Sequence, residues 1–366
     1  MFFMDKKEFI DWIKKEGLFH FIDEYAACFK RIIENNIDPV EEIIILSDHG
    51  YPTRRAAPIM AACYLEAAKQ LNINNKLLLQ NPKSSGEVAD EKIAEALLTS
   101  DNKTLLLLSM SGKMGSLKQV GKSFRKYTQE KGISFLSTTG LEELNTNMFP
   151  KFMEVIDIDY EKLRKRGRLI KEELDKGKEI HIISDKGTDL TFSKGEFKAI
   201  INDGFYHNGK GGNLPVGEVY LAIEKKKANG TFLIDASLKH RSGTIIIKGD
   251  PVKLTIKDGE VIDVEGGEPA EKLKESFTWA MEKAKLPWGI KLLSEFGIGI
   301  NPKAEILGPT VVNEKKQGTC HIAIGSNSWF GGDIFAVTHF DQVFNNPRIE
   351  IDGKTLDLKK IFDSTS

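Results

Sequence analysis

Five side chains in the C-terminal half of the sequence have the chemistry of metal ligands. They are two glutamates, two histidines and one aspartate: Glu218, Glu295, His321, His339 and Asp341. Carboxylate oxygens and imidazole nitrogens are common ligands of zinc and of other divalent ions. His339 and Asp341 are two residues apart, so on a strand both side chains point the same way. Such a His-x-Asp pair can supply half of a metal site.

Short strands are expected to position these ligands. The segment 319–324 alternates with period two, and His321 shares its face with two small residues that leave room beside the imidazole. Glu295 shares its face with two glycines in the segment 295–300, whose opposite face is apolar. Glu218 begins a third strand of the same kind. Carboxylates in such apolar surroundings need a partner, and a metal ion can satisfy several of them at once.

Composition restricts the classes of function. The chain has 366 residues, 40% hydrophobic and 29% charged, which suits two globular domains. The formal net charge of −1 gives no basic footprint for nucleic acid or for an acidic membrane surface. Three distant cysteines without a CxxC spacing favour a reducing compartment. Charged residues follow Met1-Phe-Phe-Met at once, so the N-terminal residues do not have the pattern of a signal peptide. We therefore expect a cytoplasmic protein that binds neither nucleic acid nor membranes.

The two halves of the chain have different patterns. In residues 1–158, predicted strands and helices alternate about every 25 to 30 residues, which predicts an α/β, Rossmann-like domain with a mainly parallel sheet. The expected strands are 43–46, 77–79, 104–108 and 133–136, and the expected helices are 5–36, 56–71, 87–99 and 117–131. A charged helix over 160–178 is expected to bridge to a β-rich domain, 159–366, with one clear helix over 269–285. This second domain would carry the metal site.

The N-terminal half offers two weaker candidate sites. Asp48 and His49 follow the first predicted strand, where open α/β sheets place functional groups. The segment 111–116, Ser-Gly-Lys-Met-Gly-Ser, lies between a strand and a predicted helix and could hold an anion. This segment matches neither glycine-rich nucleotide motif, so we favour a tight turn there. For Asp48 and His49 we favour a polar loop without a functional role.

Four segments of the C-terminal half together resemble the aminopeptidase T/aminopeptidase S metallopeptidases. In order they are Asn213-Leu-Pro-Val-Gly-Glu-Val, Glu295-Phe-Gly-Ile-Gly-Ile-Asn-Pro, Gly318-Thr-Cys-His-Ile-Ala-Ile-Gly and His339-Phe-Asp. The resemblance implies a cytoplasmic homodimer with an α/β domain and a mainly β domain that holds two metal ions. It places the ligands on Glu218, Glu295, His321, His339 and Asp341. One departure concerns the peptidase activity: Ser328 stands where these peptidases have a functional tyrosine, and either Tyr206 or Tyr220 is a candidate replacement.

Three functions follow from these ligands. The first is removal of N-terminal residues from short peptides by a water that two divalent ions (Zn, Co or Mn) activate, with Glu218 or Glu295 accepting its proton. The second uses His321, His339 and Asp341 as the two-histidine, one-carboxylate set of a mononuclear Fe(II) enzyme. The C-terminal half is also similar to dihydroxypyridine ring-cleaving dioxygenases. The third is a catalytically inactive relative that binds metal.

Overall fold

The chain forms two compact units in a computed structural model that describes residues 4–37, 40–84, 86–121 and 123–365. The first unit comprises Met1–Asp157 and Gly204–Val216, and the second comprises Ile158–Asp203 and Gly217–Ser366. The division at Asp157 is close to the predicted boundary at 158. The segment 204–216, which the sequence analysis assigned to the second domain, belongs to the first unit.

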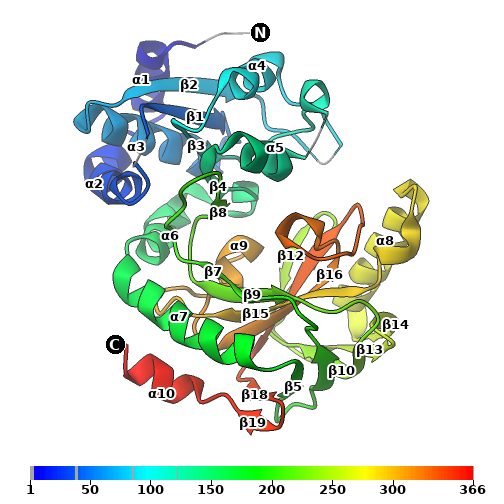
Figure 1. Cartoon of the computed structure of the whole chain (residues 1–366). Helices are drawn as coiled ribbons and strands as arrows, with labels where there is room; N and C mark the ends of the chain where they lie inside the picture. Colours follow the sequence, from blue (N-terminus) through cyan, green and yellow to red (C-terminus); the bar gives the residue numbers. More distant parts are fainter. Residues whose placement is uncertain (1–3, 38–39, 85, 122, 366) are drawn as a thin grey trace. The chain divides into compact units, whose positions relative to one another are not determined.

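The first unit is built on a five-stranded sheet in the order β2-β1-β3-β4-β8 (Figure 1). All of its neighbouring strands are parallel. The strands are β1 (Glu42–Asp48), β2 (Asn74–Gln80), β3 (Thr104–Ser109), β4 (Ser134–Thr138) and β8 (Gly211–Asn213). The short strand β8 pairs with β4, which explains why 204–216 is part of this unit although it follows the first strands of the second one.

Helices cover both faces of this sheet, as buried parallel strands require. α3 packs on β1, β2 and β3, and α2 packs on α3. A buried cluster joins Ile44 of β1 and Leu106 of β3 to Ile93 of α4 and Tyr127 of α5, so α4 and α5 cover the other face. The helices of this unit are α1 (Lys6–Lys15), α2 (His20–Glu34), α3 (Ala56–Gln70), α4 (Glu91–Thr99), α5 (Phe124–Lys131) and α6 (Phe149–Ile156).

The second unit contains two seven-stranded antiparallel sheets. One has the order β14-β13-β10-β6-β5-β18-β19, with strands Glu260–Glu265, Val252–Lys257, Ala228–Ile234, Asp189–Ser193, Glu179–Ile183, Arg348–Ile351 and Lys354–Thr355. The other has the order β12-β11-β17-β16-β15-β9-β7, with strands Gly243–Ile246, Ser237–His240, His339–Asn345, Thr319–Gly325, Leu293–Gly299, Glu218–Ala222 and Ile200–Asn202. The rings of Phe192 and Phe296, and those of Phe232 and Phe344, pair one sheet with the other.

The α-helices in the described residues of the second unit are α7 (Tyr160–Lys176), α8 (Gly267–Lys283), α9 (Thr310–Asn313) and α10 (Leu358–Asp363). α7 packs on β7 and β9, and α10 packs on α7 (Figure 1). α8 packs on β11, β13 and β14. Among the described residues, no helix combines the length and the apolar character that crossing a membrane requires.

The fold class is confirmed, while several predicted elements differ in extent. The single helix predicted over 5–36 is two helices, because the chain turns at Gly17, where φ is +74°. The helix predicted over 117–131 is a 3-10 turn at Lys118–Val120 followed by α5, with Gly121 at φ +66° after the turn. Helix α6 and the short strands β7, β8 and β11 were not predicted. These strands have only three or four residues each, too few to show a period.

Candidate metal centre

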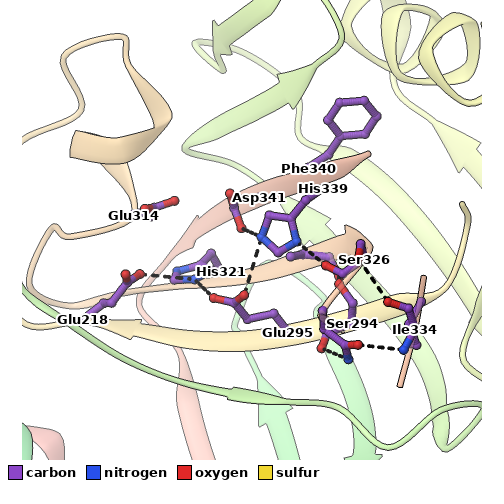
Figure 2. A network of polar contacts seen from close by, with 12 residues as sticks. Glu218, Ser294, Glu295, Glu314, His321, Ser326, Ile334, His339, Phe340 and Asp341 are labelled. Atoms are coloured by element: carbon purple, nitrogen blue, oxygen red, sulfur yellow. Dashed lines mark hydrogen bonds and ion pairs between the residues drawn. The ribbon is translucent and has the colours of Figure 1, made fainter. Parts of the chain in front are cut away.

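Four neighbouring strands of the second unit bring the five predicted residues to one face of a sheet (Figure 2). The strand order is β17-β16-β15-β9. Glu295 on β15 is opposite Ala323 on β16, and Ala323 is opposite Asp341 on β17, so these residues form one row across the sheet. His321 is opposite Gly297, which has no side chain to occupy the space of the imidazole.

The five side chains form two groups that share Glu295. One group is Glu218, Glu295 and His321, and the other is Glu295, His339 and Asp341. In each group the ligand atoms lie within 4.8 Å of one another. Oε1 of Glu295 lies 3.3 Å from Nε2 of His321, and Oε2 lies 3.5 Å from Nε2 of His339. The two oxygens of one carboxylate therefore face the histidines of different groups.

The remaining contacts orient the two histidines. Nε2 of His321 lies 3.6 Å from Oε2 of Glu218, and Nε2 of His339 lies 3.0 Å from Oδ1 of Asp341. Nδ1 of His339 lies 2.8 Å from the backbone carbonyl oxygen of Ser326, to which it donates its proton (Figure 2). A hydrogen bond of this kind on one ring nitrogen leaves the other facing the site, as in metal-ligating histidines.

The two groups differ in exposure. The side chains of His321 and Glu218 are only 1% and 6% exposed. Those of His339 and Asp341 are 18% and 15% exposed. A small molecule from solvent therefore reaches the group of His339 and Asp341 first.

Two further charged residues belong to this network and were missed in the sequence analysis. Lys315 is fully buried, and its Nζ lies 2.5 Å from Oε1 of Glu218 and 2.5 Å from Oε1 of Glu314. Asn202 also donates to Oε1 of Glu218, at 3.2 Å. In the sequence, Glu314 and Lys315 stand in the run Asn-Glu-Lys-Lys-Gln, which is typical of a solvated turn. No sequence signal marks them as buried.

Burial and mutual charge shift the pKa values of the metal-free site. Burial raises the pKa of Glu295, although the nearby histidines oppose this. Burial alone would lower the pKa of both histidines, but Glu295, Glu218 and Asp341 raise that of His321 to about 9. Asp341 and Glu295 likewise raise the pKa of His339 to about 9. In turn, His339 outweighs the effect of burial and lowers the pKa of Asp341.

Burial also acts on the pair beside the two groups. It raises the pKa of Glu314 to about 8, with Lys315 opposing the shift and Glu218 adding to it. Burial alone would lower the pKa of Lys315, but Glu218 and Glu314 outweigh it and raise that pKa. Lys315 is therefore a fixed positive charge at neutral pH.

Aromatic side chains flank the more exposed group. The loop between β16 and β17 carries Trp329 and Phe330, whose rings lie 4.6 Å and 6.5 Å from the imidazole of His339. Tyr220, one of the two proposed tyrosine replacements, contacts Phe330 at a ring distance of 5.3 Å. Ser328 begins a 3-10 turn in the same loop, with its hydroxyl 3.2 Å from that of Ser326. Tyr206, the other proposed replacement, belongs to the first unit.

The N-terminal candidates have structural partners. Asp48 is fully buried and accepts hydrogen bonds from the backbone and hydroxyl of Ser111, at 2.7 and 2.6 Å. The ring of His49 lies edge-on to that of Trp12 at 5.7 Å. In the segment 111–116 the amides of Lys113 and Ser116 donate to backbone carbonyls, and the next α-helix begins only at Phe124. Half of the amides of this segment, counting that of Ser111, are thus already paired, and no α-helix begins directly after it.

The donor set and its spacing fit divalent cations. Three carboxylates converge on two imidazoles, and three of the four contacts between them measure 3.3 to 3.6 Å. Charged hydrogen bonds are shorter, at about 2.7–2.9 Å. The hydrogen bond between His321 and Glu295 is thus a long one, and the contacts of 3.5 and 3.6 Å leave space between the ligand atoms that a cation could occupy. Fold and site together define a two-unit protein with a candidate metal centre in its β-rich unit.

Comparison with known families identifies the group. The sequence model of the 2,5-dihydroxypyridine 5,6-dioxygenase (NicX) family matches residues 24–359, so the chain belongs to that family. The aminopeptidase T/aminopeptidase S group suggested by the four segments is not the family that matches. The dioxygenases, which the sequence analysis related to the C-terminal half alone, match nearly the whole chain. A search of curated proteins found no match.

Two solved structures share the fold. The 2,5-dihydroxypyridine dioxygenase from Pseudomonas putida KT2440 aligns over 91% of this chain and 95% of its own, with a TM-score of 0.68 and 17% identity. Wild-type AmpT from Thermus thermophilus aligns over 91% of this chain and 97% of its own, with a TM-score of 0.61 and 12% identity. The fold is thus common to a dioxygenase and to AmpT, and it leaves the reaction open.

Proposed function

We propose that this chain is a metal-dependent aminopeptidase that removes N-terminal residues from short peptides. The observation that carries the proposal is the position of Glu295, whose two oxygens face His321 and His339 from between the two ligand groups. A carboxylate that presents one oxygen to each group is suited to bridge two ions. The resemblance of four segments to aminopeptidase T and aminopeptidase S, and the shared fold with AmpT, support it.

Each residue has a proposed task. Glu218 and His321 would hold one ion, His339 and Asp341 the other, and Glu295 both. When bound, two divalent ions lower the pKa of a water and polarise a substrate carbonyl. Either Glu218 or Glu295 would accept the water's proton: both oxygens of Glu295 face histidines, while Oε1 of Glu218 accepts from Lys315 and its Oε2 faces His321. The amino terminus of a peptide would reach Asp341, at the more exposed group, with the rings of Trp329 and Phe330 beside it.

The assembly is part of the proposal. The resemblance to aminopeptidases T and S implies a homodimer, and light scattering of the purified protein should give twice the mass of one chain. The mass of a single chain would contradict the proposed homodimer but not the proposed reaction.

A second function has its own support. Family membership and the dioxygenase of the same fold favour a mononuclear Fe(II) enzyme that cleaves hydroxylated rings. The ligand set expected for it was His321, His339 and Asp341. In the described part of the chain, however, His321 belongs to one group of converging ligands while His339 and Asp341 belong to the other. The group around His339 contains one histidine and two carboxylates, which is a poorer match to the set of such iron enzymes.

One experiment separates the two functions. Metal-free protein is titrated with Zn²⁺, Co²⁺, Mn²⁺ and, without oxygen, Fe²⁺, and the bound ions are counted. The loaded protein is then assayed on unblocked and N-acetylated dipeptides in air and under argon, and for oxygen consumption with 2,5-dihydroxypyridine. The proposal expects two ions per chain and hydrolysis of the unblocked peptides alone, equally fast without oxygen. One iron per chain with oxygen consumption would overturn it in favour of the dioxygenase.

A further inference from the structure

Lys315 is a buried cation attached to only one of the two ligand groups. Its side chain has 0% exposure, and its Nζ lies between the carboxylates of Glu218 and Glu314. The backbone fixes it on both sides: its amide donates to Val312, and its carbonyl accepts from Asn301. A buried ammonium is stable only with partners of this kind. The chain therefore maintains a positive charge at this point.

The contacts of Lys315 divide the carboxylate of Glu218 into two unlike oxygens. Oε1 accepts from Lys315 and from Asn202, at 2.5 and 3.2 Å. Oε2 has no such donor and faces Nε2 of His321 at 3.6 Å. Only Oε2 is thus directed at the ligand group. Lys315 orients Glu218 and removes one of its oxygens from competition for a metal.

The same contacts make the two groups electrostatically unequal. Each group contains two carboxylates, of which Glu295 is shared. In the buried group, the ammonium of Lys315 contacts both Glu218 and Glu314 and offsets part of the charge of Glu218. In the more exposed group, neither Glu295 nor Asp341 forms an ion pair with a lysine or arginine of the described residues; their partners are the histidines, and Lys315 acts on Asp341 only as a weaker, more distant charge. A divalent ion in the buried group therefore meets less negative charge.

We propose that Lys315 is a positioning residue that weakens cation binding in the group of Glu218, Glu295 and His321. The centre then has a tight position at Glu295, His339 and Asp341 and a weak, exchangeable one beside Lys315. This proposal builds on the two-ion centre proposed above and concerns the order in which its positions fill. The weaker ion would be the one that is lost on dialysis.

The test is a Co²⁺ titration of metal-free wild-type protein, Lys315→Met and the control Lys316→Met, followed by calorimetry and by the visible spectrum of bound Co²⁺. Methionine has a similar length and no charge, and Lys316 is the neighbouring, partly exposed lysine. We expect two unequal affinities in the wild type and in Lys316→Met. In Lys315→Met the weaker affinity should rise by about tenfold or more, because a unit charge a few ångströms away has been removed. The tighter affinity should change little.

Several outcomes decide the matter. If both affinities are unchanged or both fall in Lys315→Met, Lys315 does not tune the centre and the inference is wrong. If Lys315→Met is unfolded without metal, Co²⁺ should restore its folding, since the ion would replace the lost cation. Protein that stays unfolded in excess Co²⁺ would show a structural role that no divalent ion replaces, and would also overturn the inference.

The result also distinguishes this inference from the proposed function. A wild-type protein that binds one ion would contradict the two-ion centre, yet the inference still expects Lys315→Met to gain a second ion. A wild-type protein with two ions whose affinities do not respond to Lys315→Met would leave the proposed function intact and remove the role of Lys315.

Discussion

The imidazole of His321 occupies the space that a side chain at Gly297 would need. The two residues are opposite each other on β16 and β15. A Cβ added at Gly297 would lie 2.1 Å from Cε1 of His321 and 2.2 Å from Nε2. This glycine is therefore required by close packing and not by its backbone angles. It allows a fully buried histidine to lie flat across the neighbouring strand.

Gly297→Ala should displace His321 and lower metal binding. A new methyl group forces the imidazole or the strand to move, and such overpacking costs about 1–3 kcal/mol of stability. We expect a lower melting temperature and the loss of at least the ion at Glu218, Glu295 and His321. Gly249→Ala is the control, because no atom lies within 4 Å of the Cβ it would add. Full metal content in Gly297→Ala would mean that His321 is not a ligand.

The strand faces of the site were predictable from sequence because alternation is a local property. Glu295 and its two following glycines share a face in any extended strand. The pairing of the strands is not local: β9 ends at Ala222 and β15 begins at Leu293, and the two strands are neighbours in the sheet. The resemblance to known metallopeptidases, and not periodicity, placed these residues in one centre.

Lys315 shows where sequence reasoning failed. A lysine in a charged run is normally solvated, and its burial here follows from long-range contacts with Glu218 and with the backbone of Asn301. A charge balance drawn from the three predicted carboxylates alone, Glu218, Glu295 and Asp341, would favour two divalent ions and would overlook this fixed cation. With Lys315 included, one divalent ion would balance Glu218, Glu295 and Asp341, but an ionised Glu314 beside Lys315 would again leave one negative charge. The number of ions must therefore be argued from the position of Glu295 rather than from charge.

Glu295→Gln should impair both metal positions, whereas Asp341→Asn should impair one. Glu295 belongs to both groups and Asp341 only to the group with His339. We expect the count of bound ions, measured by mass spectrometry after dialysis, to fall toward zero in the first variant and toward one in the second. Glu268→Gln, at the exposed start of α8, is the matched control. Equal losses in both variants would argue against two distinct positions.

Metal binding should depend steeply on pH. In the metal-free protein the pKa values of His321 and His339 are each about 9, so both imidazoles are protonated at neutral pH. Binding requires neutral imidazoles and each position contains one histidine, so each ion releases up to one proton and the apparent affinity of each position should rise by up to about tenfold per pH unit between pH 6 and 8. Calorimetry in two buffers of different ionisation enthalpy would count these protons. Release of no protons would show that the histidines are not ligands.

The metal-free protein should lose stability as pH rises. The two histidines have pKa values raised from 6.5 to about 9 on folding, so the stability they contribute is complete below pH 6.5 and disappears as pH rises through 9. Asp341, whose pKa is lowered, acts in the opposite sense: its contribution is present above its ordinary value of 3.8 and is lost in acid. Thermal melts should therefore show a decline between pH 7 and 9.5, and bound Zn²⁺ should abolish it. A flat profile without metal would contradict these shifts.

Trp329 should favour substrates with an apolar N-terminal residue. Its half-buried ring lies 4.6 Å from the imidazole of His339, at the group that solvent reaches first, and the ring of Phe330 lies beside it. Trp329→Ala removes apolar surface from this position, so kcat/KM for leucyl peptides should fall by about tenfold relative to alanyl peptides, mostly through KM. Trp279→Ala on α8, where Arg241 covers the ring at 4.3 Å, is the control.

The ratio between the two substrates distinguishes recognition from support of the centre. If Trp329 only holds His339 in place, its loss should lower kcat for leucyl and alanyl peptides alike and reduce the bound metal. If Trp329→Ala binds less metal and the ratio of kcat/KM between leucyl and alanyl peptides is unchanged, the ring of Trp329 does not take part in substrate recognition. If this ratio changes while the metal content stays full, the loop between β16 and β17 binds the apolar N-terminal side chain of the substrate.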